Sequence, residues 1–208
     1  MQIFAILLLL FTFIHSQNVT PVDPFQDPLI ASIHARHQRG VDGDKEEVKA
    51  LVVDLEKLTL QQPKNSLLLA YLGSAYTLRS RDSFPGPGKL DFLKKGEKTL
   101  DTAVESDPQN IATRFIRAVN FYELPVIFNK RGISRSDFQI MVKQLEDPRC
   151  PQKLSDETRQ AIYFYAGLSY KQLKQPDQAK VVWENGLKIS TISPLGEKIK
   201  KELSRLKV

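Results

Sequence analysis

Two stretches of the chain carry the same pattern of residue types: L-A-Y-L-G-S-A-Y at residues 69–76 and Y-F-Y-A-G-L-S-Y at residues 163–170. Each begins with a large apolar residue, has Leu or Ala followed by Gly at the fourth and fifth positions, and ends with Tyr. This spacing places these residues on one side of a helix. Because Gly has no side chain, it lets a second helix approach closely, and the aromatic ring fills the space one turn further on. The pattern therefore predicts closely packed pairs of antiparallel helices.

A matching second helix follows each of the two stretches. The residues expected to pack back against the first helix are Gly96, Leu100 and Ala103 in one pair and Ala179, Trp183 and Gly186 in the other. Asp107 and Pro108 close the earlier pair. A third copy fits less well and lies between them, with Ala118 and Phe121 on its first helix and Ser136 and Ile140 on its second.

These three copies, which cover residues 66–190, resemble the tetratricopeptide repeat (TPR) family. The resemblance implies a short α-α superhelix, a TPR-like solenoid, of about three helical hairpins plus capping helices. Leu51, Leu55 and Leu58 fit the second half of an earlier, degenerate copy, whose helix ends before Pro63. A C-terminal helix over 194–206 fits a capping role, because its apolar residues lie on one side and its lysines elsewhere.

Apolar periodicity extends this interpretation along the chain and predicts an all-α protein. No stretch alternates as a strand would. The expected helices span residues 66–80, 88–106, 109–123, 134–146, 156–174, 177–190 and 194–206. Two hairpins carry extra residues relative to the last one, at 79–90 and 124–134. Such insertions in repeat proteins lie on one face and often contribute to binding.

The run F-P-G-P-G-K within the first insertion invites comparison with a phosphate-binding loop. That motif needs Gly five residues before Gly88 and Ser or Thr after Lys89, where this chain has Ser83 and Leu90. We therefore interpret the run as the joint between two helices.

The residues at the N-terminus have the pattern of a signal peptide for export. Residues 3–14 are nearly all apolar, too few to span a bilayer comfortably but typical of a secretory signal. We expect a cleaved signal peptide at 1–16, a Pro-rich extended leader at 17–28 and the helical repeat domain at 29–208, with the mature protein secreted or periplasmic. An uncleaved anchor is the alternative. Cys150 is the only cysteine, so no disulfide within the chain is expected.

Composition narrows the partner classes. The chain has 30 Lys and Arg against 24 Asp and Glu, a formal charge of +6, and the two signs are interleaved. This is typical of a solvated surface rather than of a nucleic-acid footprint. Contact of the basic C-terminal helix with a membrane surface is an open alternative, without integral insertion after signal removal.

Metal, cofactor and catalytic sites receive no support from the sequence. His34 and His37 can lie on one side of a helix, but no third ligand accompanies them, so we expect solvated histidines. Asp42-Gly43-Asp44 is better explained by a turn in which Asp44 caps the next helix, since Glu47 stands at the capping-box position. We therefore predict a non-enzymatic protein with no cofactor and no metal.

Arg114 and Arg117 stand at inward positions of the middle copy, where apolar residues are expected. A buried arginine must be paired. Asp82, Glu123 and Asp137 are the candidate partners. Either an internal salt-bridge network or a recessed basic pocket for an anionic ligand satisfies this pattern. If the helix is rotated so that Phe115, Ala118 and Tyr122 face inward, the arginines are merely exposed.

The resemblance implies a concave surface, lined by the first helix of each hairpin, that holds a peptide or another protein. Carried onto this sequence, that surface would include Ser74, Thr77 and Leu78; Phe115, Val119 and Tyr122; and Phe164, Leu168 and Lys171. The predicted partner-binding residues are Thr77, Arg79, Arg81, Asp82, Arg114, Arg117, Tyr122 and Lys171. The alternative function is binding of a small anionic or amphipathic ligand, or an accessory role in envelope assembly, with a basic pocket around Arg114 and Arg117.

Overall fold

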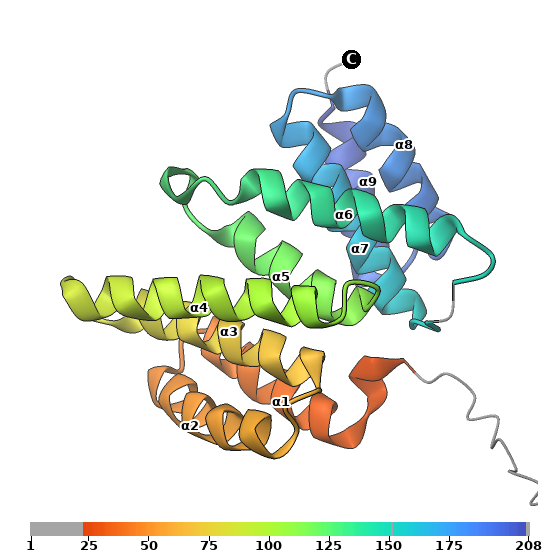
Figure 1. The fold of residues 1–208 in the computed structure, drawn as a ribbon. Coiled ribbons are helices and arrows are strands. Elements are labelled where there is room, and N and C mark those ends of the chain that lie inside the picture. The colour runs from red at the N-terminus through yellow and green to blue at the C-terminus, as the bar shows by residue number, and fades with distance from the viewer. Residues whose placement is uncertain (1–22, 151, 207–208) are drawn as a thin grey trace, which may run out of the picture.

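The computed structural model describes residues 23–150 and 152–206, and within these ranges it is all-helical (Figure 1). The α-helices are α1 Pro28–Val41, α2 Lys45–Gln61, α3 Ser66–Asp82, α4 Pro87–Ser106, α5 Ile111–Glu123, α6 Arg131–Glu146, α7 Asp156–Gln172, α8 Pro176–Leu187 and α9 Pro194–Ser204. Two short 3-10 helices are η1 Pro24–Gln26 and η2 Val126–Phe128. The predicted all-α class is confirmed, and the seven predicted helices from residue 66 onward begin and end within a few residues of those observed.

Local sequence explains where the helices begin. Asn65, Asn110, Ser155 and Ser193 each accept a hydrogen bond from the backbone N–H three residues later, which satisfies a donor that the helix leaves free. Proline occupies the first position of α1, α4, α8 and α9, where no N–H is required. Asp44 accepts from the backbone N–H of Glu47, as predicted, and begins α2.

The helices pack in consecutive pairs, α1 with α2, α3 with α4, α5 with α6 and α7 with α8 (Figure 1). The first helices of these pairs also contact one another, α1 with α3, α3 with α5 and α5 with α7. The last helix of the described ranges, α9, packs on both α7 and α8 and buries Ile199 beside Trp183 in one cluster. No helix of the described ranges is both long and apolar enough to cross a membrane.

Glycine sets the spacing within the first and last of the predicted hairpins. A Cβ added to Gly73 would lie 2.7 Å from the Leu100 side chain and 2.8 Å from the Leu100 backbone N. A Cβ on Gly167 would lie 2.2 Å from Nε1 of Trp183. Both distances are shorter than any contact that carbon tolerates, so only Gly fits. The close approach that the repeated pattern predicts is confirmed.

The middle hairpin follows a different register on its second helix. Ser136 and Ile140, which the sequence pattern placed inside, are exposed. Ser134, Phe138 and Met141 are buried instead, and the Ser134 hydroxyl donates to the Ala118 carbonyl at 2.7 Å. The prediction of Ser136 and Ile140 was wrong, because the inward positions lie two residues earlier, at Ser134 and Phe138. Ala118 and Phe121 are buried as predicted.

The extra residues of the first insertion lengthen helices. The α3 helix runs to Asp82 and α4 begins at Pro87, so only residues 83–86 form the turn between them. Gly86 has φ +155°, a conformation that other residues rarely adopt. The F-P-G-P-G-K run is therefore the joint between two helices, as predicted.

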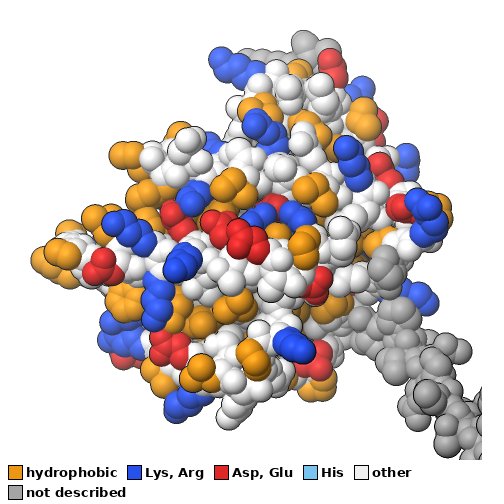
Figure 2. Space-filling model, viewed as in Figure 1, with side chains coloured by type: hydrophobic (Ala, Val, Ile, Leu, Met, Phe, Trp, Pro, Cys, Tyr) orange, Lys and Arg blue, Asp and Glu red, His pale blue; other side chains and the backbone are white. Residues whose placement is uncertain are grey.

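Both inserted turns expose large apolar side chains. Phe84 is 90% exposed at the α3–α4 turn, and Ile127 is 86% exposed in η2, between α5 and α6. Figure 2 shows hydrophobic side chains on the projecting tip where α4 begins, and Lys and Arg interspersed with Asp and Glu over the rest of this face.

The N-terminal part differs from the predictions in two ways. Residues 23–28 are not an extended leader, because Asp23 is buried against α7 and Phe25 packs into the core. In place of a half-unit, α1 and α2 form a complete hairpin, with Gly40 close against Val48. The predicted signal peptide and the rest of the leader lie outside the described residues.

Candidate interaction surface

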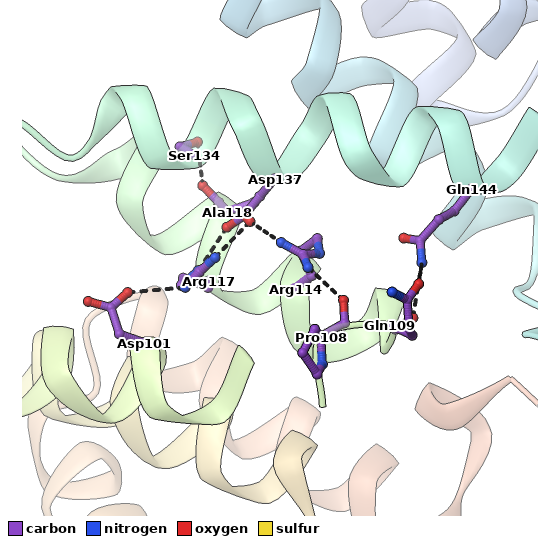
Figure 3. A network of polar contacts seen from close by, with 9 residues as sticks. All are labelled: Asp101, Pro108, Gln109, Arg114, Arg117, Ala118, Ser134, Asp137 and Gln144. Atoms are coloured by element: carbon purple, nitrogen blue, oxygen red, sulfur yellow. Dashed lines mark hydrogen bonds and ion pairs between the residues drawn. The ribbon is translucent and has the colours of Figure 1, made fainter. Parts of the chain in front are cut away.

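The two inward arginines of α5 form a buried ion-pair network with α6 (Figure 3). The Arg114 guanidinium donates to Asp137 at 2.5 Å and to the Pro108 carbonyl at 2.6 Å. Arg117 donates twice to Asp137, at 2.8 Å through each nitrogen, and once to Asp101 at 3.2 Å. Asp137 is 1% exposed and Arg114 7%. The carboxylate of Asp137 is thus shared by two arginines and joins α5 to α6.

The electrostatics of Arg117 agree with this geometry. Burial opposes its charge, but the hydrogen bonds and negative charges of Asp137 and Asp101 outweigh burial and raise its pKa. A buried pair of this kind does not add much net stability, yet removing one partner leaves an uncompensated charge at a cost of about 3–5 kcal/mol. The network therefore fixes how α5 and α6 pair.

This network corrects the predicted basic pocket. Asp137 is the partner among the three candidates, whereas Asp82 pairs with its neighbour Arg81 and Glu123 is exposed. With both guanidinium groups bound to protein carboxylates, Arg114 and Arg117 are held within the fold and do not form an open anion pocket. The internal salt-bridge alternative is the one observed.

Thr77 also lies inside the fold. It is 7% exposed, and its hydroxyl donates to the Ser74 carbonyl and accepts from Asn120 of α5 at 2.7 Å. Ser74 accepts from Asn120 as well and contacts His37 of α1 at 2.8 Å. Contrary to the partner-binding prediction, Thr77 and Ser74 belong to a polar seam that joins α1, α3 and α5.

The predicted border residues at the end of α3 hold neighbouring elements together. Arg81 donates to the carbonyls of Gly40 and Val41, the last residues of α1, which have no partner within that helix. The Arg79 guanidinium lies over the Phe92 ring, 5.4 Å from its centroid. Asp82 accepts from Arg81 at 2.8 Å. Arg81 therefore links α3 to α1, and Arg79 links α3 to α4.

The histidines make specific contacts, although the sequence suggested plain solvation. The His34 side chain is solvent-accessible but its Nδ1 lies 3.0 Å from the Tyr71 hydroxyl, and burial lowers its pKa. His37 is half-buried, and burial together with the positive charges of His34 and Arg81 lowers its pKa to about 4. Both imidazoles are therefore neutral near pH 7. Within the described ranges, no three His, Cys, Asp or Glu side chains gather as metal ligands.

Partly exposed aromatic side chains connect α5 with α7. The Tyr165 ring lies edge to face against three other rings. Its centroid is 6.3 Å from that of Phe115, 5.8 Å from that of Tyr122 and 5.4 Å from that of Phe164. Val119 packs beside them. We call Phe115, Val119, Tyr122, Phe164 and Tyr165 the aromatic face. Burial raises the pKa of Tyr122, and the charge of Glu123 adds to this, so the phenol stays protonated and can donate a hydrogen bond.

Lys171 lies on the same helix as Tyr165, near the C-terminal end of α7. Its ammonium pairs with Glu202 of α9 at 2.5 Å, and its side chain is 39% exposed. It also lines an open depression of about 400 Å³ with Lys174, Pro176, Arg205 and Leu206. Of the eight predicted partner-binding residues, Tyr122 and Lys171 are the two that combine a place on or near the aromatic face with accessible surface.

A second open depression, of about 550 Å³, lies where α6, α7 and α8 meet. Sequence reasoning did not single it out, because its residues come from helix ends far apart in the chain. Its lining is of mixed charge: Glu146, Asp156, Arg159, Tyr163, Asn185, Lys188 and Ile189.

Comparison with known proteins finds no protein family whose model matches this chain and no curated protein that matches its sequence. Function must therefore be argued from the geometry.

Proposed function

We propose that this protein is an exported, non-catalytic scaffold whose helical hairpins form a short TPR-like solenoid, and that it binds a peptide or protein partner on the aromatic face. The observation that carries the proposal is the set of partly exposed rings on α5 and α7 that contact Tyr165. Aromatic side chains present a large apolar surface at low entropic cost, and they are enriched where proteins bind partners.

The chemistry of the surroundings favours an acidic or amphipathic segment as the partner. The Tyr122 hydroxyl offers a donor, and Lys171, Lys174 and Arg205 place positive charge around the nearby depression. The chain as a whole carries a formal charge of +6, which attracts an acidic partner over distances of about one Debye length, roughly 8–10 Å. The aromatic rings would bury apolar surface of the partner. The basic residues would orient the partner and raise its rate of association.

The test is a quantitative pull-down from native envelope extract with matched variants. The variant Tyr122→Ala with Lys171→Glu removes one ring and reverses one charge on the proposed surface. The control, Phe84→Ala with Lys89→Glu, removes one ring at the exposed α3–α4 turn and reverses one charge in the first turn of α4. We expect the first variant to retain less than a tenth of at least one protein that the wild type and the control capture equally. Equal capture by all three, with matching circular dichroism, would refute the assignment.

Export is a separate part of the proposal and rests on the apolar run at residues 3–14. Mass spectrometry of the protein from its native source should find a mature N-terminus near residue 17. A chain that keeps Met1 and sediments with membranes would favour the uncleaved anchor instead.

A further inference from the structure

The segment before α1 is attached to α7 by one carboxylate. Asp23 Oδ2 accepts hydrogen bonds from the Ser155 backbone N–H at 2.7 Å and from the Thr158 hydroxyl at 3.3 Å, and its Oδ1 accepts from the Phe25 N–H at 3.0 Å. Asp23 is 5% exposed. Ser155 is the N-cap of α7, where the helix presents partial positive charge. A carboxylate two residues before an aromatic ring therefore fills a complementary site.

Phe25 extends the aromatic face at its N-terminal end. Its ring lies edge to face against the rings of Phe115 and His34, with centroid separations of 6.4 Å and 6.2 Å. Phe115 in turn contacts Tyr165, so Phe25 is the next ring in the same series. The segment thus makes the two kinds of contact, carboxylate and aromatic, that were proposed for a partner.

The segment, which includes the short helix η1, can detach without unwinding α1. Asp27 is the N-cap of α1 and accepts from the N–H groups of Leu29 and Ile30. Residues 23–26 precede this cap. Within the described residues, the hydrogen bonds between this segment and α7 all involve the Asp23 carboxylate. Its backbone hydrogen bond is local, from Gln26 to Asp23.

We propose that Asp23–Phe25 is a tethered ligand of the α7 N-terminus and the aromatic face, and that this site binds a partner segment with the same acidic–x–aromatic pattern. This inference rests on the proposed function and specifies its ligand class. Because the segment is part of the chain, its effective concentration at the site is in the millimolar range. A partner must displace it, so the segment sets a threshold for binding.

The experiment uses the full chain and a fluorescein-labelled peptide with the sequence of residues 21–28. Asp23→Ala with Phe25→Ala removes both anchors of the tethered segment and leaves Asp27 in place. We expect this variant to bind the peptide at least tenfold more tightly than the wild type, measured by fluorescence anisotropy. The matched control is the same peptide with Asn at the Asp23 position and Ala at the Phe25 position, which should bind at least tenfold more weakly.

Two results would overturn the proposal. One is that the Asp23→Ala, Phe25→Ala variant keeps its helical content but does not bind the peptide; the other is that both peptides bind equally.

If this variant does not fold, amide exchange of the wild type tests whether the segment detaches. A tethered ligand leaves by local opening, so the Ser155 amide should exchange faster than core amides such as that of Leu55. If the amides of Ser155 and Leu55 both exchange only by global unfolding, the segment does not detach locally and the proposal is wrong. Failure of either kind leaves the Tyr122 and Lys171 pull-down to judge the proposed function separately.

Discussion

The Asp23 carboxylate and the Ser155 amide are 132 residues apart in the chain and 2.7 Å apart in the structure. This contact joins the start of the described chain to the N-terminus of the fourth hairpin. A charge-assisted hydrogen bond of this kind contributes about 1.5–3 kcal/mol. If the segment detaches locally, however, the loss on mutation cannot exceed the free energy of that local opening.

We therefore expect Asp23→Ala to lower the free energy of unfolding by about 1–2 kcal/mol, as measured by urea denaturation. The control, Asp156→Asn, removes one negative charge from the first turn of the same helix, where the exposed Asp156 carboxylate pairs with the partly buried Arg159. Amide exchange at Ser155 should accelerate in the Asp23 variant and stay near wild type in the control. If Asp23→Ala lowered the free energy of unfolding by about 3–5 kcal/mol, as is expected for loss of a buried charge partner, the segment would not be detachable.

Asp137→Asn is expected to destabilise the protein by about 3–5 kcal/mol, because it removes the charge that two buried arginines share. Asp91→Asn, at an exposed position of α4, should change stability by less than about 0.5 kcal/mol. Chemical denaturation of both variants measures the contrast. Similar small effects would mean that Arg114 and Arg117 are compensated in another way.

Gly167→Ala tests the close approach of α7 and α8. The new methyl group would lie 2.2–2.5 Å from three atoms of the Trp183 ring, so the helices must move apart, at about 1–3 kcal/mol. Gly132→Ala is the matched control, since nothing lies within 4 Å of its added Cβ. Because Ala suits a helix better than Gly, the control should be neutral or more stable by up to about 1 kcal/mol. Thermal denaturation of the pair should separate them by several degrees.

The register of the middle hairpin predicts a second contrast between neighbours. Met141 is fully buried, so Met141→Ala should cost about 2–5 kcal/mol. Ile140 is 37% exposed, and Ile140→Ala should cost less than about 1 kcal/mol. The reverse order in urea denaturation would restore the register that the sequence pattern suggested.

His37 should make stability depend on pH. Its pKa falls from 6.5 to about 4 on folding, so the unfolded chain binds a proton between pH 6.5 and 4 while the folded chain does not. Stability from this group is thus fully present above pH 6.5 and is lost as pH falls through 4, by about 3 kcal/mol in all. The urea midpoints of wild type and His37→Gln, compared from pH 7 to 4, isolate this histidine from the carboxylates. Parallel curves would contradict a depressed pKa.

Local sequence determined the helices and the contacts inside two hairpins. Helix caps such as Asn65 and Ser155 act within one turn, and the apolar period is a property of the helix itself, so the all-α class and the approximate helix boundaries could be predicted. The closeness at Gly73 and Gly167 could be predicted as well, because a missing side chain next to a repeated apolar pattern has one packing consequence.

The tertiary structure alone decided which distant groups meet. The sequence showed that Arg114 and Arg117 need a carboxylate but offered three, and only the pairing of α5 with α6 selects Asp137. The inward side of α6 carries Ser134, Phe138 and Met141, and a degenerate repeat pattern that follows an insertion does not fix this register. Asp23 and Ser155 meet because the three packed hairpins between them, α1–α2, α3–α4 and α5–α6, bring the start of the described chain against the start of α7. Periodicity acts within a helix, whereas these contacts depend on the position of every helix between them.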